Sequence, residues 1–139
     1  MVRDSERRNM ATEKTLKSDF DLDYRYGSEG EQLVNALLTG GKTVEVKRDR
    51  RWSETGNIFV EYECWYNNSQ TWELSGLSVS KAAYWAFVLE ETVIIVPRFH
   101  VDWACRMYGR PITCKIEPNN SRGFLITTDH LMMAAEELK

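Results

Sequence analysis

Three carboxylates and one ammonium group in the middle of the chain have the types and spacing that metal-dependent chemistry needs. Glu45 and Lys47 alternate with valines over residues 43–47, and Glu61 and Glu63 alternate with apolar residues over 58–63. Because side chains in a strand point alternately to opposite faces, pairing of these segments would gather all four charges on one surface. Like charges facing each other destabilise a sheet, so we expect a divalent cation among them.

The elements around these residues predict an α/β fold of the α+β type, in which helices flank a central mixed sheet. Ser28 and Glu31 fit a capping box at the start of a helix, and the β-branched run at 92–96 is typical of a strand buried on both faces. In chain order we expect a helix from Ser28 to Gly40, strands over 43–47, 58–66 and 71–77, a helix over 78–87, a strand over 92–96, a helix over 99–108, strands over 112–116 and 123–126, and a helix from Thr128.

Composition limits the class of protein. Residues 1–19 are polar and aperiodic, which predicts a flexible arm ahead of a single domain over 20–139. The chain has no apolar run long enough for a membrane span, and its three cysteines lack CxxC spacing. Its first twenty residues are polar and mixed in charge and resemble neither a signal peptide nor a transit peptide, so we expect neither. We therefore expect a cytoplasmic protein with reduced thiols. Since the net charge is −3, any contact with nucleic acid must come from a local basic patch.

Simpler explanations exist for each of these residues. In the simpler explanation, Glu31 caps the helix as a capping-box residue and binds no metal. Glu45 and Lys47 can form the solvated face of an antiparallel sheet and make surface ion pairs with the two acids of 58–63, which would contribute little energy. The basic residues at 47–51 can be a solvated charge run. His100 and His130 are isolated and lack metal-ligand spacing, so we expect structural roles for both.

The order of elements and three motifs resemble the PD-(D/E)XK nuclease superfamily. A helix with an acid, a strand with an acid, a hairpin to a strand with further acids, and then a helix and a buried strand form the core order of that superfamily. The similarity covers about residues 24–96 and extends to small phage-type endonucleases of its Holliday-junction-resolvase-like part. It is carried by Val-Glu-Val-Lys-Arg-Asp-Arg at 44–50, Thr-Gly-Asn-Ile-Phe-Val-Glu-Tyr-Glu at 55–63 and Ser-Gly-Leu-Ser-Val-Ser-Lys-Ala-Ala-Tyr-Trp-Ala-Phe-Val at 75–88.

The resemblance implies a restriction-endonuclease-like core and a metal site. Glu45 and Glu61 match the acids of the two core strands and would ligate Mg²⁺, with Mn²⁺ as an alternative, while Glu31 matches the acid on the helix. The family pattern has a lysine where this chain has Glu63, so Lys47 would have to supply the ammonium group from the neighbouring strand. Glu31 or Glu63 would complete the catalytic set, either by binding the metal through water or by completing a second metal site.

The implied activity is hydrolysis of DNA phosphodiester bonds, with branched or otherwise structured DNA as the substrate. Five residues are candidates for contacts with DNA: Arg48, Arg50, Arg51, Lys81 and the stacking residue Trp52. The resemblance also implies that the protein is encoded by a phage. It further implies a homodimer, because two DNA strands must be cut. Two other functions stay open: a catalytically inactive relative that binds nucleic acid or protein through the same surface, and an interaction protein whose acidic face meets a basic partner.

Overall fold

The computed structural model describes residues 13–115 and 118–139, with side chains from Tyr24 onward within these ranges. The chain divides into two compact units, Met1–Lys42 and Thr43–Lys139. The first unit contains α2, a single helix over Glu13–Thr39. This helix begins well before Ser28, so the predicted start at a Ser28 capping box is wrong. Of the predicted arm, residues 13–19 are helical, and residues 1–12 lie outside the described part of the chain.

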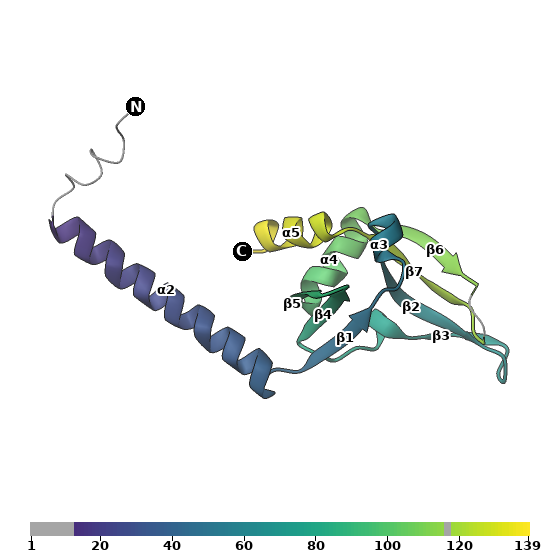
Figure 1. Cartoon of the computed structure of the whole chain (residues 1–139). Helices are drawn as coiled ribbons and strands as arrows, with labels where there is room; N and C mark the ends of the chain where they lie inside the picture. The colour runs from purple at the N-terminus through teal and green to yellow at the C-terminus, as the bar shows by residue number, and fades with distance from the viewer. Residues whose placement is uncertain (1–12, 116–117) are drawn as a thin grey trace, which may run out of the picture. The chain divides into compact units, whose positions relative to one another are not determined.

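The second unit contains two sheets (Figure 1). A three-stranded sheet has the order β1-β4-β5, in which β1 (Val44–Arg48) runs parallel to β4 (Tyr84–Leu89) and β5 (Thr92–Pro97) runs antiparallel to β4. An antiparallel four-stranded sheet has the order β3-β2-β7-β6. Its strands are β3 (Thr71–Leu74), β2 (Ile58–Tyr66), β7 (Ser121–Ile126) and β6 (Arg110–Cys114). With its helices, this arrangement confirms the α+β class; the restriction-endonuclease-like core stays a prediction.

Two helices complete the core between the sheets. α4 (Arg98–Tyr108) packs against β4, β5 and β7, and also against α5 (Thr128–Glu137). The side chains that are most completely buried come from both sheets and both helices: Trp85, Phe87, Ile58, Ile126, Leu131, Val60 and Val101. Two short turns of helix, α3 (Trp52–Thr55) and η1 (Gly76–Ser78), lie in the connections before β2 and β4. No helix in the described part of the chain is long and apolar enough to cross a membrane.

The helix predicted over 78–87 is wrong. This segment contains the last residue of η1, an irregular connection over 79–83 and the first part of β4, and Trp85, Ala86 and Phe87 are all buried in the strand. Alanines favour a helix in isolation, but β4 is the central strand of its sheet and pairs on both sides. The backbone hydrogen bonds and the burial gained there outweigh the local preference. The run at 92–96 does form a strand, β5, although Val93 and Ile95 are exposed, so its burial on both faces was also wrong.

The expected pairing of the two charged strands does not occur, because β1 and β2 belong to different sheets. The connection between them is shaped by Asp49. Its Oδ1 atom accepts a hydrogen bond from the backbone N–H of Arg51 at 2.8 Å, and its Oδ2 atom accepts one from Phe59 N–H at 2.9 Å. One carboxylate thus holds both the turn into α3 and the start of β2. The chain leaves β1 through a turn and a helical segment instead of a tight hairpin.

Candidate active site

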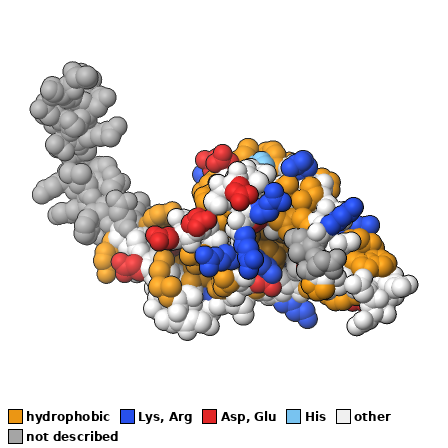
Figure 2. All heavy atoms as spheres, turned by 45° about the vertical axis from the view of Figure 1, so that its right-hand side comes forward, with side chains coloured by type: hydrophobic (Ala, Val, Ile, Leu, Met, Phe, Trp, Pro, Cys, Tyr) orange, Lys and Arg blue, Asp and Glu red, His pale blue; other side chains and the backbone are white. Residues whose placement is uncertain are grey.

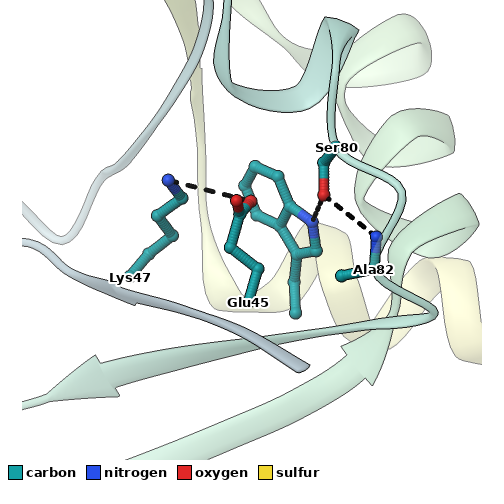
Figure 3. Close-up of polar contacts among 5 residues, drawn as sticks. Glu45, Lys47, Ser80 and Ala82 are labelled. Carbon is teal, nitrogen blue, oxygen red and sulfur yellow. Dashed lines mark hydrogen bonds and ion pairs between the residues drawn. The ribbon is translucent and has the colours of Figure 1, made fainter. Parts of the chain in front are cut away.

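Glu45 and Lys47 lie on the same side of β1, and their charged groups meet (Figure 3). The Nζ atom of Lys47 is 3.7 Å from Oε2 of Glu45. Their side chains are 43% and 33% exposed, respectively, whereas Val46 between them is 63% exposed. The apolar residue of the strand therefore faces outward, and the two charged residues occupy the half-buried face. This is the reverse of the solvated charged face that alternation alone would favour.

The side wall of this site is Trp85. It pairs in register with Glu45 across the parallel β1–β4 ladder and is 1% exposed. Its indole N–H donates to Oγ of Ser80 at 3.0 Å, and this oxygen also accepts from Ala82 N–H at 3.4 Å. Lys47 Nζ lies 5.3 Å from the centroid of the Trp85 ring, within the range of a cation–π contact. The ammonium group is thus held between an aromatic ring and a carboxylate.

One oxygen of Glu45 has an unusual environment. Oε2 is buried from solvent and receives no hydrogen bond, and the Lys47 ammonium at 3.7 Å is beyond hydrogen-bond distance. A buried carboxylate oxygen normally accepts hydrogen bonds, because an unpartnered one loses its solvation without compensation. The lone pairs of Oε2 therefore receive no hydrogen bond within the described residues, which is unusual for a buried carboxylate oxygen.

Glu61 and Glu63 occupy two different environments on β2. The pairing with β7 shifts between them, so that Glu61 lies opposite Gly123 and Glu63 lies opposite Arg122. Glu63 Oε2 is 3.9 Å from Nη1 of Arg122. Glu61 lies close to Cys64: burial first, and then the Glu61 charge, raises the pKa of that thiol. The two acids therefore do not share one site through simple strand alternation.

Gly76 in η1 lies directly against the backbone of Glu61. Gly76 was not among the predicted site residues. Its φ angle is +52°, and a Cβ on it would collide with the carbonyl oxygen of Glu61. Only glycine tolerates both conditions without strain. The chain before β4 can therefore approach β2 closely at the position of the acid. The isolated glycine in Ser-Gly-Leu-Ser is the local feature that indicates this contact, because such a glycine often marks a close backbone approach.

The predicted metal ligands Glu45 and Glu61 lie on strands of different sheets, β1 and β2. Glu31 is an exposed residue of α2 and belongs to the first unit, so its relation to Glu45 stays a prediction. Within residues 13–115 and 118–139, no group of three or more His, Cys, Asp or Glu side chains is arranged to hold a metal ion. The structure brings Glu45 together with Lys47, Trp85 and Ser80, of which the last two were not predicted to be site residues.

The predicted contacts with DNA lie mostly at the surface. Arg48, Arg50 and Arg51 are exposed at the end of β1 and in the turn that follows, and Lys81 is exposed just before β4. Figure 2 shows Lys and Arg side chains gathered near the middle of one face. Trp52 is different, because its ring is partly buried against the hydrophobic core. This packing leaves only part of the ring for stacking on a base.

Comparison with known proteins gives no match: no family model, no curated protein and no solved structure resembles this chain closely enough to be reported.

Proposed function

We propose that the protein is a metal-dependent endonuclease that hydrolyses DNA phosphodiester bonds, with Glu45 and Lys47 at the centre of its active site. The observation that carries this proposal is the buried Oε2 atom of Glu45, which has no hydrogen bond and lies 3.7 Å from a lysine ammonium group. Such an arrangement costs stability, and functional sites are where proteins commonly retain such costs. Glu45 also matches the acid of the first core strand in the nuclease superfamily that the sequence resembles, and Lys47 would supply the ammonium group that the superfamily pattern has at the position of Glu63.

The chemistry of the donor set suits Mg²⁺ or Mn²⁺. Magnesium is commonly bound by one or two carboxylates, several waters and the phosphate oxygens of the substrate. Glu45 would be the first protein ligand, with Glu61 as a second. When bound, the ion neutralises charge at the phosphate and lowers the pKa of a coordinated water. Lys47 would bind a non-bridging phosphate oxygen, and the Trp85 ring would keep its ammonium group in place.

Exposed basic residues support DNA as the substrate class. The exposed arginines Arg48, Arg50 and Arg51, together with Lys81, would contact backbone phosphates and hold the DNA in register without reading its sequence. Branched or otherwise structured DNA is the substrate we propose, cut by a homodimer so that both strands are cleaved.

The test is a cleavage assay on labelled four-way junction, flap, duplex and single-stranded DNA with Mg²⁺, with Mn²⁺ or with EDTA. We expect metal-dependent cleavage by the natural protein, and a loss of at least about 100-fold in rate for Glu45→Gln and for Lys47→Met. Glu91→Gln is the matched control, because Glu91 is an exposed residue in the turn between β4 and β5. Its cleavage rate should be unchanged. Cleavage by Glu45→Gln at the natural rate would refute the site assignment.

A second function is favoured by Glu63. This residue stands where the superfamily pattern has a lysine, and its carboxylate is paired with Arg122. A catalytically inactive module that binds nucleic acid would fit this substitution. It predicts binding of the same DNA substrates in EDTA and no cleavage with either metal, whereas the first proposal predicts cleavage as soon as metal is added.

A further inference from the structure

A guanidinium group lies over an aromatic ring on the four-stranded sheet, on a different part of the second unit from Glu45. The Cζ atom of Arg122 lies 3.8 Å from the centroid of the Trp72 ring, and Nη1 is 3.9 Å from the Glu63 carboxylate. The Arg122 side chain is nevertheless 39% exposed. Since the ring and the carboxylate restrict its movement, this guanidinium group can stack on a second flat group at a reduced cost in conformational entropy.

The ring under Arg122 is itself held in place by its neighbours. Trp65 lies opposite Trp72 in the β2–β3 hairpin, with ring centroids 5.7 Å apart in an edge-to-face arrangement. The indole N–H of Trp65 donates to the side-chain oxygen of Asn67 at 3.0 Å. Both tryptophans are only half-buried. Tryptophan is costly to leave at a surface, and an ordered, partly exposed pair of this kind is typical of a binding surface.

An open groove continues from this aromatic pair along the same face of the sheet. Its volume is about 530 Å³, and its apolar wall includes Tyr62, Leu74 and Phe124. Leu74 lies two positions after Trp72 on β3, and Phe124 lies two positions after Arg122 on β7. Because residues two apart in a strand share a face, the groove and the tryptophan pair form one surface. We call it the Trp72 surface.

The charge of the Trp72 surface is positive. Arg98 and Arg106 also line the groove, so that with Arg122 the surface carries three guanidinium groups. The Nε atom of Arg98 donates to the backbone carbonyl of Ala82 at 3.1 Å, which leaves its Nη atoms for a ligand. Its two carboxylates are each next to an arginine: Asp102 is 3.0 Å from Nε of Arg106, and Glu63 is beside Arg122. In a chain with a net charge of −3, a local excess of positive charge next to aromatic rings favours a partner that is both anionic and flat.

We propose that the Trp72 surface binds an unpaired, single-stranded segment of the DNA substrate. One base would stack on the exposed side of the Arg122 guanidinium group, neighbouring bases would lie along the groove against Tyr62 and Leu74, and phosphates would contact Arg98 and Arg106. Aromatic platforms next to cations are how proteins bind single strands without sequence preference. The identity of the polymer rests on the proposed nuclease function, but the binding itself does not require cleavage.

The experiment measures binding of a fluorescein-labelled dT₂₀ oligonucleotide and of a blunt duplex by fluorescence anisotropy, in EDTA and at low salt. Arg122→Lys keeps the charge but loses the planar group that stacks, so we expect it to weaken single-strand binding by about 5- to 100-fold and to leave duplex binding nearly unchanged. Trp72→Phe, which removes the larger ring, should weaken single-strand binding in the same direction. Far-UV circular dichroism and thermal midpoints would confirm that both variants fold.

The matched control is Arg110→Lys, because Arg110 is an exposed arginine of the same sheet. Arg110 pairs with Leu125, whose side chain points to the other side of the sheet from that of its neighbour Phe124. Arg110 therefore lies on the face of the sheet opposite to the Trp72 surface. We expect it to bind single strands like the natural protein. Equal affinity of Arg122→Lys and the natural protein for dT₂₀ would overturn the proposal, as would an equal loss in Arg110→Lys. Preference for an acidic peptide such as poly-glutamate over dT₂₀ would overturn it in favour of a protein partner.

The two proposals fail in different ways. If no metal supports cleavage but single-strand binding depends on Arg122, the nuclease proposal fails and the Trp72 surface stands. If Glu45→Gln abolishes cleavage but Arg122→Lys binds dT₂₀ normally, the active site stands and the Trp72 surface does not.

Discussion

Replacing Glu45 with methionine is expected to stabilise the protein while abolishing its proposed activity. Methionine has nearly the shape of glutamate but carries no charge, so Glu45→Met removes the buried oxygen that has no hydrogen bond. Leaving a buried polar group without a partner costs about 1–3 kcal/mol. The substitution also loses the ion pair with Lys47, but both side chains are at least one-third exposed, so this pair contributes no more than about 1 kcal/mol.

The difference predicts that the free energy of unfolding rises by about 1 kcal/mol. For a domain of this size, each kcal/mol corresponds to about 4–8 °C in the thermal midpoint. Urea unfolding followed by tryptophan fluorescence, together with a thermal scan, would measure the change. Two further variants check the reasoning. Lys47→Met leaves the carboxylate without its cation and should lower the stability, and Glu91→Met, at an exposed turn, should change it by less than about 0.5 kcal/mol.

A loss of more than about 1 kcal/mol in Glu45→Met would refute this account. It would mean that the carboxylate holds β1 in place, so that its position is explained by structure alone. A gain in stability together with loss of cleavage would be the trade-off expected of a residue retained for its chemistry.

Two other predictions follow from the packing of the second unit. Gly123→Ala should lower the free energy of unfolding by about 1–3 kcal/mol, because a Cβ there would collide with the Phe59 ring and the backbone of Val60. Gly30→Ala is the control and should not lower it, because Gly30 has open space around it in α2. Equal losses of stability for the two variants in urea unfolding would contradict the packing argument. Burial, and then the Asp102 carboxylate, raises the pKa of the Cys105 thiol from 9.0 to about 12, so this thiol should resist iodoacetamide at neutral pH. The stability that the protonated Cys105 thiol contributes is present below pH 9 and is lost as the pH rises through about 12. Cys105→Ala should therefore reduce the loss of stability at alkaline pH. Rapid alkylation of Cys105 in the native protein would argue against its burial.

Most of the strands and the last two helices could be predicted from the sequence, because alternation, β-branched runs and turn residues are local signals. The N-terminal helix was predicted only in part. Gly27 and Gly30 lie inside α2, although glycine ordinarily marks a break in a helix. The helix prediction at 78–87 was wrong for a different reason. The conformation of this segment depends on pairing with β5 and with β1, and β1 lies far from it in the sequence.

The candidate site shows the same division. The Glu45–Lys47 spacing placed both charges on one face, and the structure confirms that they share it. Sequence alternation could not tell which face is buried, because that depends on Trp85 in the neighbouring strand. Sequence alternation also could not show that β1 and β2 belong to different sheets. The connection between them is held by hydrogen bonds from the Arg51 and Phe59 N–H groups to Asp49, and these bonds have no sequence motif.

The parallel pairing of β1 with β4 has a consequence for how fast the site can form. Thr43 Oγ1 accepts a hydrogen bond from Ala83 N–H across 40 positions of sequence, and the β2–β3 hairpin lies between these two residues. Contacts of such long range form slowly, because the entropy of closing the loop must be overcome before they are gained. We therefore expect the hairpin with Trp65 and Trp72 to form early in refolding, and the environment of Trp85 beside Glu45 to form late. During synthesis, Glu45 leaves the ribosome well before the strand that buries it, so the charged pair completes its site only after β4 has been made.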